Sequence, residues 1–232
     1  MPGKSKPNNR GSKDNRGSKD KNSKDKKIKD ATSKSKMPKD YSLYKDWRHD
    51  PNYKSNVKVR DRRARKYISE NYDTISKSNI EPGMLIMFDY FEPKFKADLE
   101  YYDAMPSTIF FNVFKTKDGE PRVLGFNLHY YPPRVRVRVM NHILEIFKEV
   151  YKKSWNDPEQ KVQYFDYKML IYLLKKSNLE FGVHMYIPNL MANITPIAPK
   201  DWVQVCMTEG RFKKATRDTI MKYWKSRRPG KK

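Results

Sequence analysis

The positive charge of this chain is concentrated at its two ends, and this limits where a hydrophobic core can form. The 232 residues carry 50 Lys and Arg against 27 Asp and Glu, which gives a formal net charge of +23. Residues 1–40 hold fourteen basic and five acidic side chains, and residues 211–232 hold ten and one. Each end therefore contributes +9, and only +5 remains for residues 41–210. We expect the core to form mainly in this central part.

So large an excess of positive charge indicates a polyanionic partner. A compact basic domain repels itself, and counterion release favours each Lys or Arg that neutralises a phosphate. Nucleic acid is the first candidate. The alternatives are an acidic protein, a membrane surface, or a solvated basic surface with no specific ligand.

The first forty residues are a low-complexity segment. The tetrapeptide Gly11–Asp14 recurs at Gly17–Asp20 and, with Asn in place of Gly, at residues 22–25. So short a period cannot bury a hydrophobic face. We predict that residues 1–40 form a disordered basic arm and that residues 41–232 form a single folded domain.

Three further properties limit the class of protein. Cys206 is the only cysteine, which excludes an intramolecular disulfide and a cysteine-rich zinc site. No run approaches the ~18 apolar residues of a membrane span. The basic N-terminal residues are not followed by the apolar stretch of a secretory signal. We expect a soluble protein that is made in the cytosol and does not contact a membrane.

Three apolar or β-branched segments predict a small antiparallel sheet. Their predicted strands are residues 84–91, 108–115 and 122–129. Between the last two lies Lys117–Glu120, whose central Asp-Gly is typical of a β-hairpin. Residues 201–207 are a candidate last strand. The sheet is expected to be open or barrel-like.

Apolar residues at spacings of three and four predict helices over residues 57–76, 133–153, 164–177 and 212–228. The alternating Arg and Val of residues 134–139 also fit a strand, but the preceding double proline favours a helix start. The sequence thus predicts an α+β domain in which about four helices cover the sheet.

Candidate catalytic residues are few, and none has the spacing of a known site. The histidines are His49, His129, His142 and His184. They form no zinc-helix pair, and we expect them to be packed or on the surface. Asp89, Asp98 and Asp103, with Lys94 and Lys96, fit either a Mg²⁺-dependent nuclease or ordinary charged loop residues. No glycine-rich phosphate-binding motif occurs, so we expect no cofactor, no metal and no small-molecule ligand.

The strongest functional signal is electrostatic. Basic side chains cluster in residues 60–66, 134–138 and 211–228, and we predict that these segments converge on one DNA-binding face. The alternative is three separate solvated helix faces. The candidate DNA-binding residues are Arg60, Arg62, Arg63, Arg65, Lys66, Lys94, Lys96, Arg134, Arg136, Arg138, Arg211, Lys213, Lys214, Arg217, Arg227 and Arg228.

An ordered series of motifs resembles a known family. The motifs are Pro82–Lys94, Leu99–Pro106, Gly125–Arg136 and Ile197–Trp202. They resemble those of the DNA end protector proteins of T-even-like tailed phages, over about residues 80–225. The resemblance implies a virion protein, assembled in the host cytoplasm, that binds the free end of packaged DNA and shields it from host exonucleases. It also implies contact with other virion proteins near the portal or tail, and it brings no catalytic residues.

The sequence therefore favours a non-enzymatic phage virion protein that binds double-stranded DNA, mostly through its phosphates, at a genome end. One alternative is a structural adaptor of the neck, tail or baseplate that meets acidic neighbouring subunits without touching DNA. The other is a metal-dependent nuclease that acts during packaging.

Overall fold

The computed structural model describes residues 37, 39, 41–49, 53–91, 96–157 and 166–227. These residues belong to one compact unit, Lys36–Lys232. The predicted basic arm lies almost wholly outside the described residues, so its disorder stays a prediction.

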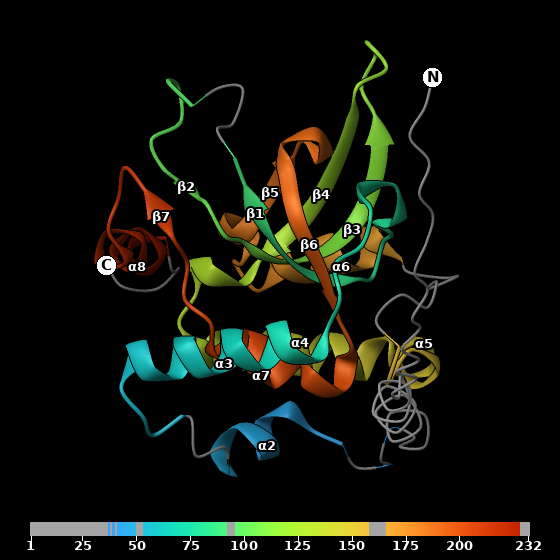
Figure 1. The fold of residues 1–232 in the computed structure, drawn as a ribbon, viewed down its shortest axis with the longest axis vertical. Helices are drawn as coiled ribbons and strands as arrows, with labels where there is room; N and C mark the ends of the chain where they lie inside the picture. The colour runs from blue at the N-terminus through green and yellow to red at the C-terminus, as the bar shows by residue number, and fades with distance from the viewer. Residues whose placement is uncertain are drawn as a thin grey trace, which may run out of the picture. The chain divides into compact units, whose positions relative to one another are not determined.

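A five-stranded antiparallel sheet forms the centre of this unit (Figure 1). Its strands are β1 (Leu85–Tyr90), β3 (Ser107–Lys115), β4 (Pro121–Asn127), β5 (Val183–Tyr186) and β6 (Met191–Ile197). They are ordered β5-β4-β3-β1-β6, and the two edge strands do not pair with each other. The sheet is therefore open, and the barrel-like alternative is wrong.

The predicted hairpin is confirmed as β3 and β4. Val113 pairs with Val123, and the turn closes where the Thr116 N–H donates to the Glu120 carbonyl at 2.9 Å. Gly119 has a φ of +76°, a conformation that glycine adopts without the steric cost of a Cβ. The Asp-Gly pair was thus a sound signal for this turn.

A second, two-stranded sheet joins distant parts of the chain. Its strands are β2 (Tyr102–Asp103) and β7 (Phe212–Lys213), which pair antiparallel. The C-terminal segment is thereby held next to the loop that follows β1.

The two faces of the large sheet belong to two hydrophobic cores, because side chains alternate along a strand. Leu85 and Met87 of β1 belong to the main core, which includes most of the buried helical residues. Ile86 and Phe88 point to the other face, where a smaller cluster includes Phe110 and aromatic residues of the neighbouring strands.

Seven α-helices occur among the described residues. They are α2 (Leu43–His49), α3 (Val57–Asn71), α4 (Pro133–Ile146), α5 (Lys148–Lys153), α6 (Tyr167–Lys176), α7 (Trp202–Met207) and α8 (Arg217–Ser226). Short 3₁₀ turns lie at Lys77–Asn79, Leu128–Tyr130, Glu180–Gly182, Pro188–Leu190 and Pro199–Asp201. Figure 1 shows α3, α7 and α4 side by side in one layer, with α2 beyond them. The predicted α+β class is confirmed, with more and shorter helices than expected.

Several predicted boundaries were wrong for identifiable reasons. The predicted strand 201–207 is instead helix α7 (Trp202–Met207), preceded by the 3₁₀ turn that ends at Asp201, since a short run buried on nearly every side has no periodicity that separates strand from helix. The predicted helix 133–153 is two helices that meet at Phe147 (φ −102°, ψ 28°). The segment predicted as a helix over residues 212–228 begins with strand β7. Helix α8 starts only after Thr216, whose side chain accepts a hydrogen bond from the Thr219 N–H.

Two strands of the large sheet, β5 and β6, were not predicted at all, and neither was the short β2 of the second sheet. Strands β5 and β6 lie in residues 178–199, which contain several prolines and asparagines and show little alternation. Both are edge strands, and β6 includes Pro196 within its span. Proline is tolerated at a sheet edge, where one side of the strand needs no ladder hydrogen bond.

Candidate nucleic-acid interface

A buried carboxylate in α3 ties the start of this helix to a distant segment. Oδ1 of Asp61 accepts a hydrogen bond from Nε of Arg65 at 2.8 Å, one helical turn later. Oδ2 of Asp61 lies 2.7 Å from Nη2 of Arg211. Oδ1 also accepts from the backbone N–H of Glu209 at 2.8 Å. Asp61 therefore fixes residues 209–211 against α3.

A second buried carboxylate, that of Glu209, binds arginines from three helices. Oε1 lies 3.2 Å from Nη2 of Arg60 in α3. Oε2 lies 2.7 Å from Nε of Arg217 in α8 and 3.6 Å from Nη2 of Arg136 in α4. Glu209 can reach all three because it follows directly on the C-cap of α7, which packs between α3 and α4. We call Asp61, Glu209, Arg60, Arg65, Arg136, Arg211 and Arg217 the arginine network.

Arg136 is fully buried and serves as a tie between helices. Its Nε donates to the Tyr131 carbonyl at 2.6 Å, and its Nη1 donates to the carbonyls of Cys206 and Thr208. Burial lowers the pKa of Arg136, and the carboxylate of Glu209 opposes this shift. A guanidinium stays protonated even under such a shift, because its ordinary pKa exceeds 12. Arg136 therefore holds the start of α4 against the end of α7.

The arginine network carries more positive than negative charge. Its five guanidinium groups face only two carboxylates. Charges that are partly withdrawn from water are screened less than exposed ones. The side chain of Arg211 is 53% exposed and that of Arg217 is 36% exposed. The excess positive charge therefore reaches the surface at the loop before α8 and at its first turn.

A smaller basic cluster forms where α2 meets the start of α4. The Tyr44 hydroxyl accepts from Nη2 of Arg48 at 2.8 Å, and the Arg48 guanidinium lies 4.5 Å from the Tyr44 ring centre. The hydrogen bond from Arg48 and the nearby charge of Arg134 lower the pKa of Tyr44. Arg48 and Arg134 are thereby placed beside each other on the surface.

One buried group has the arrangement of a hydrolase triad. Nδ1 of His129 lies 2.6 Å from Oδ2 of Asp103, and Nε2 of His129 lies 3.0 Å from Oγ of Ser107. The Thr208 hydroxyl also contacts Nε2 of His129 at 2.9 Å. Serine proteases use the same contacts, but their serine is open to the substrate. Here Ser107 is 0% exposed and His129 is 1% exposed, so no substrate reaches the Ser107 hydroxyl in this conformation.

The protonation of this group fits a structural role. Burial lowers the pKa of His129, although the charge of Asp103 opposes it. Burial works against ionisation of Asp103, but the hydrogen bond from His129 and those from the backbone N–H groups of Met105 and Arg211 hold its pKa below the usual value. A neutral imidazole then donates from Nδ1 to the Asp103 carboxylate and accepts at Nε2 from the Ser107 hydroxyl, while the Thr208 hydroxyl donates to the Val205 carbonyl. The group satisfies its own polar atoms within the core.

The three candidate Mg²⁺ ligands do not form one site. Asp103 is engaged by His129, Asp89 accepts from the Asn193 amide at 2.6 Å, and Asp98 is exposed. No group of three or more His, Cys, Asp or Glu side chains able to hold a metal ion occurs among the described residues. In the same part of the chain, no helix is both long and apolar enough to cross a membrane.

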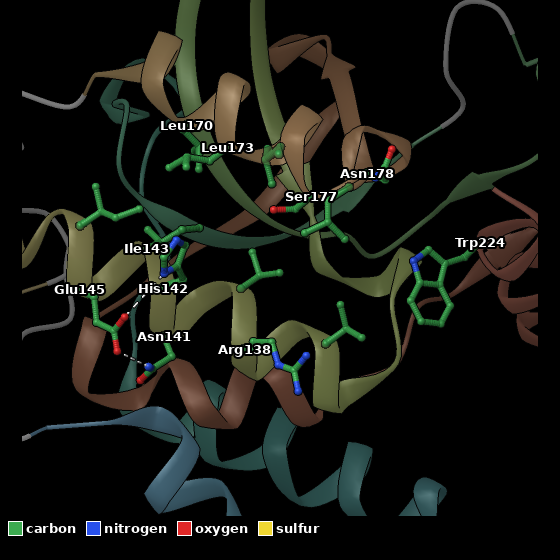
Figure 2. Close-up of a pocket in the computed structure, with 15 residues that line it drawn as sticks. Arg138, Asn141, His142, Ile143, Glu145, Leu170, Leu173, Ser177, Asn178 and Trp224 are labelled. Atoms are coloured by element: carbon green, nitrogen blue, oxygen red, sulfur yellow. Dashed lines mark hydrogen bonds and ion pairs between the residues drawn. The ribbon is translucent and has the colours of Figure 1, made fainter. Parts of the chain in front are cut away.

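An apolar groove of about 540 Å³ lies between α4 and α6 (Figure 2). Arg138, His142 and Glu145 line it on the α4 side, and Leu170 and Leu173 line it on the α6 side. His142 lies 3.6 Å from Glu145 and is exposed, which fits the expected surface histidine. The groove thus adjoins one of the arginines that the sequence assigned to DNA.

The comparison with protein families identifies the chain. A family model described as Phage T4 terminal DNA protecting protein matches residues 10–226, which is nearly the whole sequence. This chain belongs to that family. This match confirms the family resemblance that the motifs from Pro82 onward predicted. The name of the family associates the chain with the ends of phage DNA. Neither a search of curated proteins nor a search of solved structures gave a match.

The predicted DNA-binding residues of this member of the terminal DNA protecting family differ in how far they are exposed to solvent. Arg62, Arg63, Lys66, Lys96, Arg134, Arg138, Arg211, Lys213, Lys214 and Arg227 are exposed. Arg65 and Arg217 are half-buried, and Arg60 and Arg136 are buried in the arginine network. Lys94 and Arg228 lie outside the described residues. The three basic segments meet through the arginine network, which takes five of their arginines and buries two of them, Arg60 and Arg136.

Sequence reasoning missed the residues that join these segments. Asp61 is the one acidic residue within the basic run of residues 60–66, and Glu209 lies two residues before the last basic segment, which begins at Arg211. An isolated carboxylate inside a cationic stretch was the available signal, since like charges brought together require a counter-charge. Nothing in the sequence indicated that the two carboxylates would lie side by side.

Proposed function

We propose that this protein binds the end of double-stranded phage DNA through backbone phosphates and shields it from host exonucleases. The observation that carries the proposal is the arginine network, which joins three basic segments far apart in the sequence and leaves an excess of positive charge. Membership of the terminal DNA protecting family supports DNA ends as the target.

The network gives its arginines two different tasks. Arg60, Arg65 and Arg136 bind carboxylates or backbone carbonyls inside the protein, so they position the helices. Arg211 and Arg217 hold one side of the guanidinium on a carboxylate and remain partly exposed. Guanidinium groups can bind phosphate in a fixed bidentate geometry, which suits this position.

The exposed basic residues of the neighbouring elements extend this surface. Arg62 and Arg63 come from α3, and Arg134 comes from the first turn of α4. A cation in the first turn of a helix is slightly disfavoured by the helix dipole, and a bound phosphate would offset this. We assign phosphate contact to Arg62, Arg63, Lys66, Lys96, Arg134, Arg138, Arg211, Lys213, Arg217 and Arg227, with Lys94 and Arg228 as candidates from the sequence. Lys214 is assigned a positioning role, because its ammonium group donates to the carbonyls of Lys96, Ala97 and Leu99.

The proposal includes a place for the protein in the phage particle. A protein that guards a genome end is expected in the virion, near the portal or tail, with other virion proteins as neighbours. We also propose that it acts without cleaving DNA, since the triad-like group found among the described residues is closed to substrate.

The test is a titration of purified protein with short linear duplexes of unrelated sequence at several salt concentrations. If about six phosphates are engaged, affinity should fall roughly a thousandfold between 50 and 200 mM salt, with little dependence on sequence. Absence of binding at the lowest salt, or an affinity that salt does not change, would contradict DNA binding and favour the structural adaptor.

A further inference from the structure

A pocket lined by tyrosines lies beside the proposed interface. Its volume is about 240 Å³, and five of its wall residues are Tyr90, Tyr101, Tyr102, Tyr130 and Tyr186. We call it the tyrosine pocket. Its volume is below the usual range for drug-sized ligands, so it suits a single small planar ring system.

Contacts between aromatic rings hold the walls of the tyrosine pocket in place. Tyr90 and Tyr186 meet edge to face with ring centres 5.2 Å apart, and the rings of Tyr130 and His184 lie 4.2 Å apart. Tyr101 stacks on Tyr223 at 5.7 Å, which fixes the ring from behind. Tyr90, Tyr130 and Tyr186 are largely buried. Tyr101 and Tyr102 are partly exposed and can present ring surface to a ligand without first having to be ordered.

The pocket also holds an unsatisfied polar atom. Nε2 of His184 is buried and has no hydrogen-bond partner among the described residues. Burial lowers the pKa of His184 to about 4, although a hydrogen bond with the Phe181 backbone opposes this. The ring is therefore neutral near pH 7, and its unpaired nitrogen is a hydrogen-bond acceptor without a partner in the wall of the pocket.

Basic residues lie near the pocket, and one of them, Arg122, lines it together with the carboxylate of Asp103. Met185, at 55% exposed, and the partly exposed Leu99 are the most accessible wall residues, so the mouth lies between them. Lys213 pairs with Tyr102 across β2 and β7. Arg227 lies 4.9 Å from the Phe181 ring centre, and Phe181 in turn packs on Tyr130. A ligand in the pocket that carries a phosphate would have cations close to its charge.

We propose that the tyrosine pocket takes the terminal nucleobase of a DNA end, unpaired from the opposite strand. Stacking of bases on aromatic side chains, with cations along the backbone, is the common way in which proteins hold unpaired nucleotides. The inference rests on the proposed function, because it supplies the feature that separates an end from internal duplex: only an end has a base that leaves the stack at low cost.

The test compares duplexes that differ only in the base of a one-nucleotide overhang. One carries a normal nucleotide and the other an abasic residue, so the phosphates are identical, and both 3′ and 5′ overhangs are used. The unmodified protein should bind the normal overhang about tenfold more tightly than the abasic one at one polarity or the other. Equal affinities for both pairs would overturn the inference while leaving DNA binding itself intact.

Variants of the protein show whether the preference for the normal overhang depends on the tyrosine pocket. Tyr101→Ala should reduce the tenfold ratio to near one, and Tyr101→Phe should preserve it because the ring remains. Tyr172→Ala is the matched control, since Tyr172 is 63% exposed on α6 and does not line the pocket. A ratio that Tyr101→Ala and Tyr172→Ala leave equally unchanged would place the base elsewhere and contradict the inference.

A separate readout distinguishes the two proposals. If no duplex binds, the proposed function fails, but a nucleoside monophosphate still probes the pocket. Titration should then shift the NMR signals of the His184 ring and saturate. Signals that stay unchanged up to millimolar nucleotide would overturn the pocket as well.

Discussion

Glu209 is the single residue on which the arginine network depends most. Its carboxylate lies within 3.6 Å of guanidinium groups from α3, α4 and α8, and only 9% of its side chain is exposed. Because these side chains are largely shielded from water, each buried charge needs the opposite charge beside it to be stable. The same contacts that create the proposed DNA surface are therefore part of what keeps the helices together.

Glu209→Gln should destabilise the protein. The amide keeps the shape of the side chain but removes the charge that Arg60 and Arg136 face, so the free energy of unfolding should fall by about 3 kcal/mol. Chemical denaturation measures this change. Glu145→Gln is the control, because Glu145 is an exposed partner of His142 and its loss should cost less than about 0.5 kcal/mol. Equal small effects for both variants would show that the network contributes little to stability.

Single residues were also where the sequence was least informative about the site. The basic residues were found because charge is visible in any segment, whereas Asp61 and Glu209 matter through neighbours that lie almost 150 positions away. Likewise the sequence shows Asp103 and His129 only as separate candidates, and it is the fold that brings them to 2.6 Å in the core. Composition predicts how much charge is present, but tertiary contacts decide which charges remain available.

At the level of elements, α4 has two distinct sides. Arg136 points into the protein, while Arg134 and Arg138, two positions before and after it, are exposed. Positions two apart on a helix do not share a face, so the run of alternating arginines divides between a structural and a binding role.

Replacing Arg134 and Arg138 together by Gln should weaken DNA binding without unfolding the protein. Each lost phosphate contact should lower the slope of log affinity against log salt by about one unit, uniformly across DNA sequences. The control is Lys175→Gln with Lys176→Gln, which removes the same charge from the exposed last turn of α6, outside the proposed surface. A loss of affinity that is the same in both double variants would mean that only net charge matters.

The elements that sequence reasoning predicted correctly are those with strong local signals. The hairpin of β3 and β4 has an Asp-Gly turn between β-branched and aromatic runs, and α3 has regular apolar spacing. The element that was misassigned, α7, is buried on nearly every side, so tertiary packing and not periodicity decides its form. Strands β5 and β6 could not be predicted because their pairing with β4 and β1, which are distant in the sequence, defines them, and their own residues show little alternation.

At the scale of the whole molecule, three features bear on function. The chain belongs to the terminal DNA protecting family, its basic segments meet around two carboxylates, and a tyrosine pocket opens beside them. The first two support a surface for DNA phosphates. The third offers a reason why an end would be preferred to the interior of a duplex. The central claim is therefore protection of DNA ends, beyond general affinity for DNA.

That claim is tested most directly by digesting linear DNA with an added exonuclease in the presence of increasing amounts of the protein. A restriction enzyme that cuts one internal site reports in parallel on general coverage, and a sample with Mg²⁺ but no added nuclease reports on cleavage by the protein itself. The account predicts that the ends resist the exonuclease at protein concentrations that leave the internal site fully cuttable, and that the sample without nuclease stays intact. Ends that are digested as fast as naked DNA, or ends and internal site protected to the same degree, would contradict it.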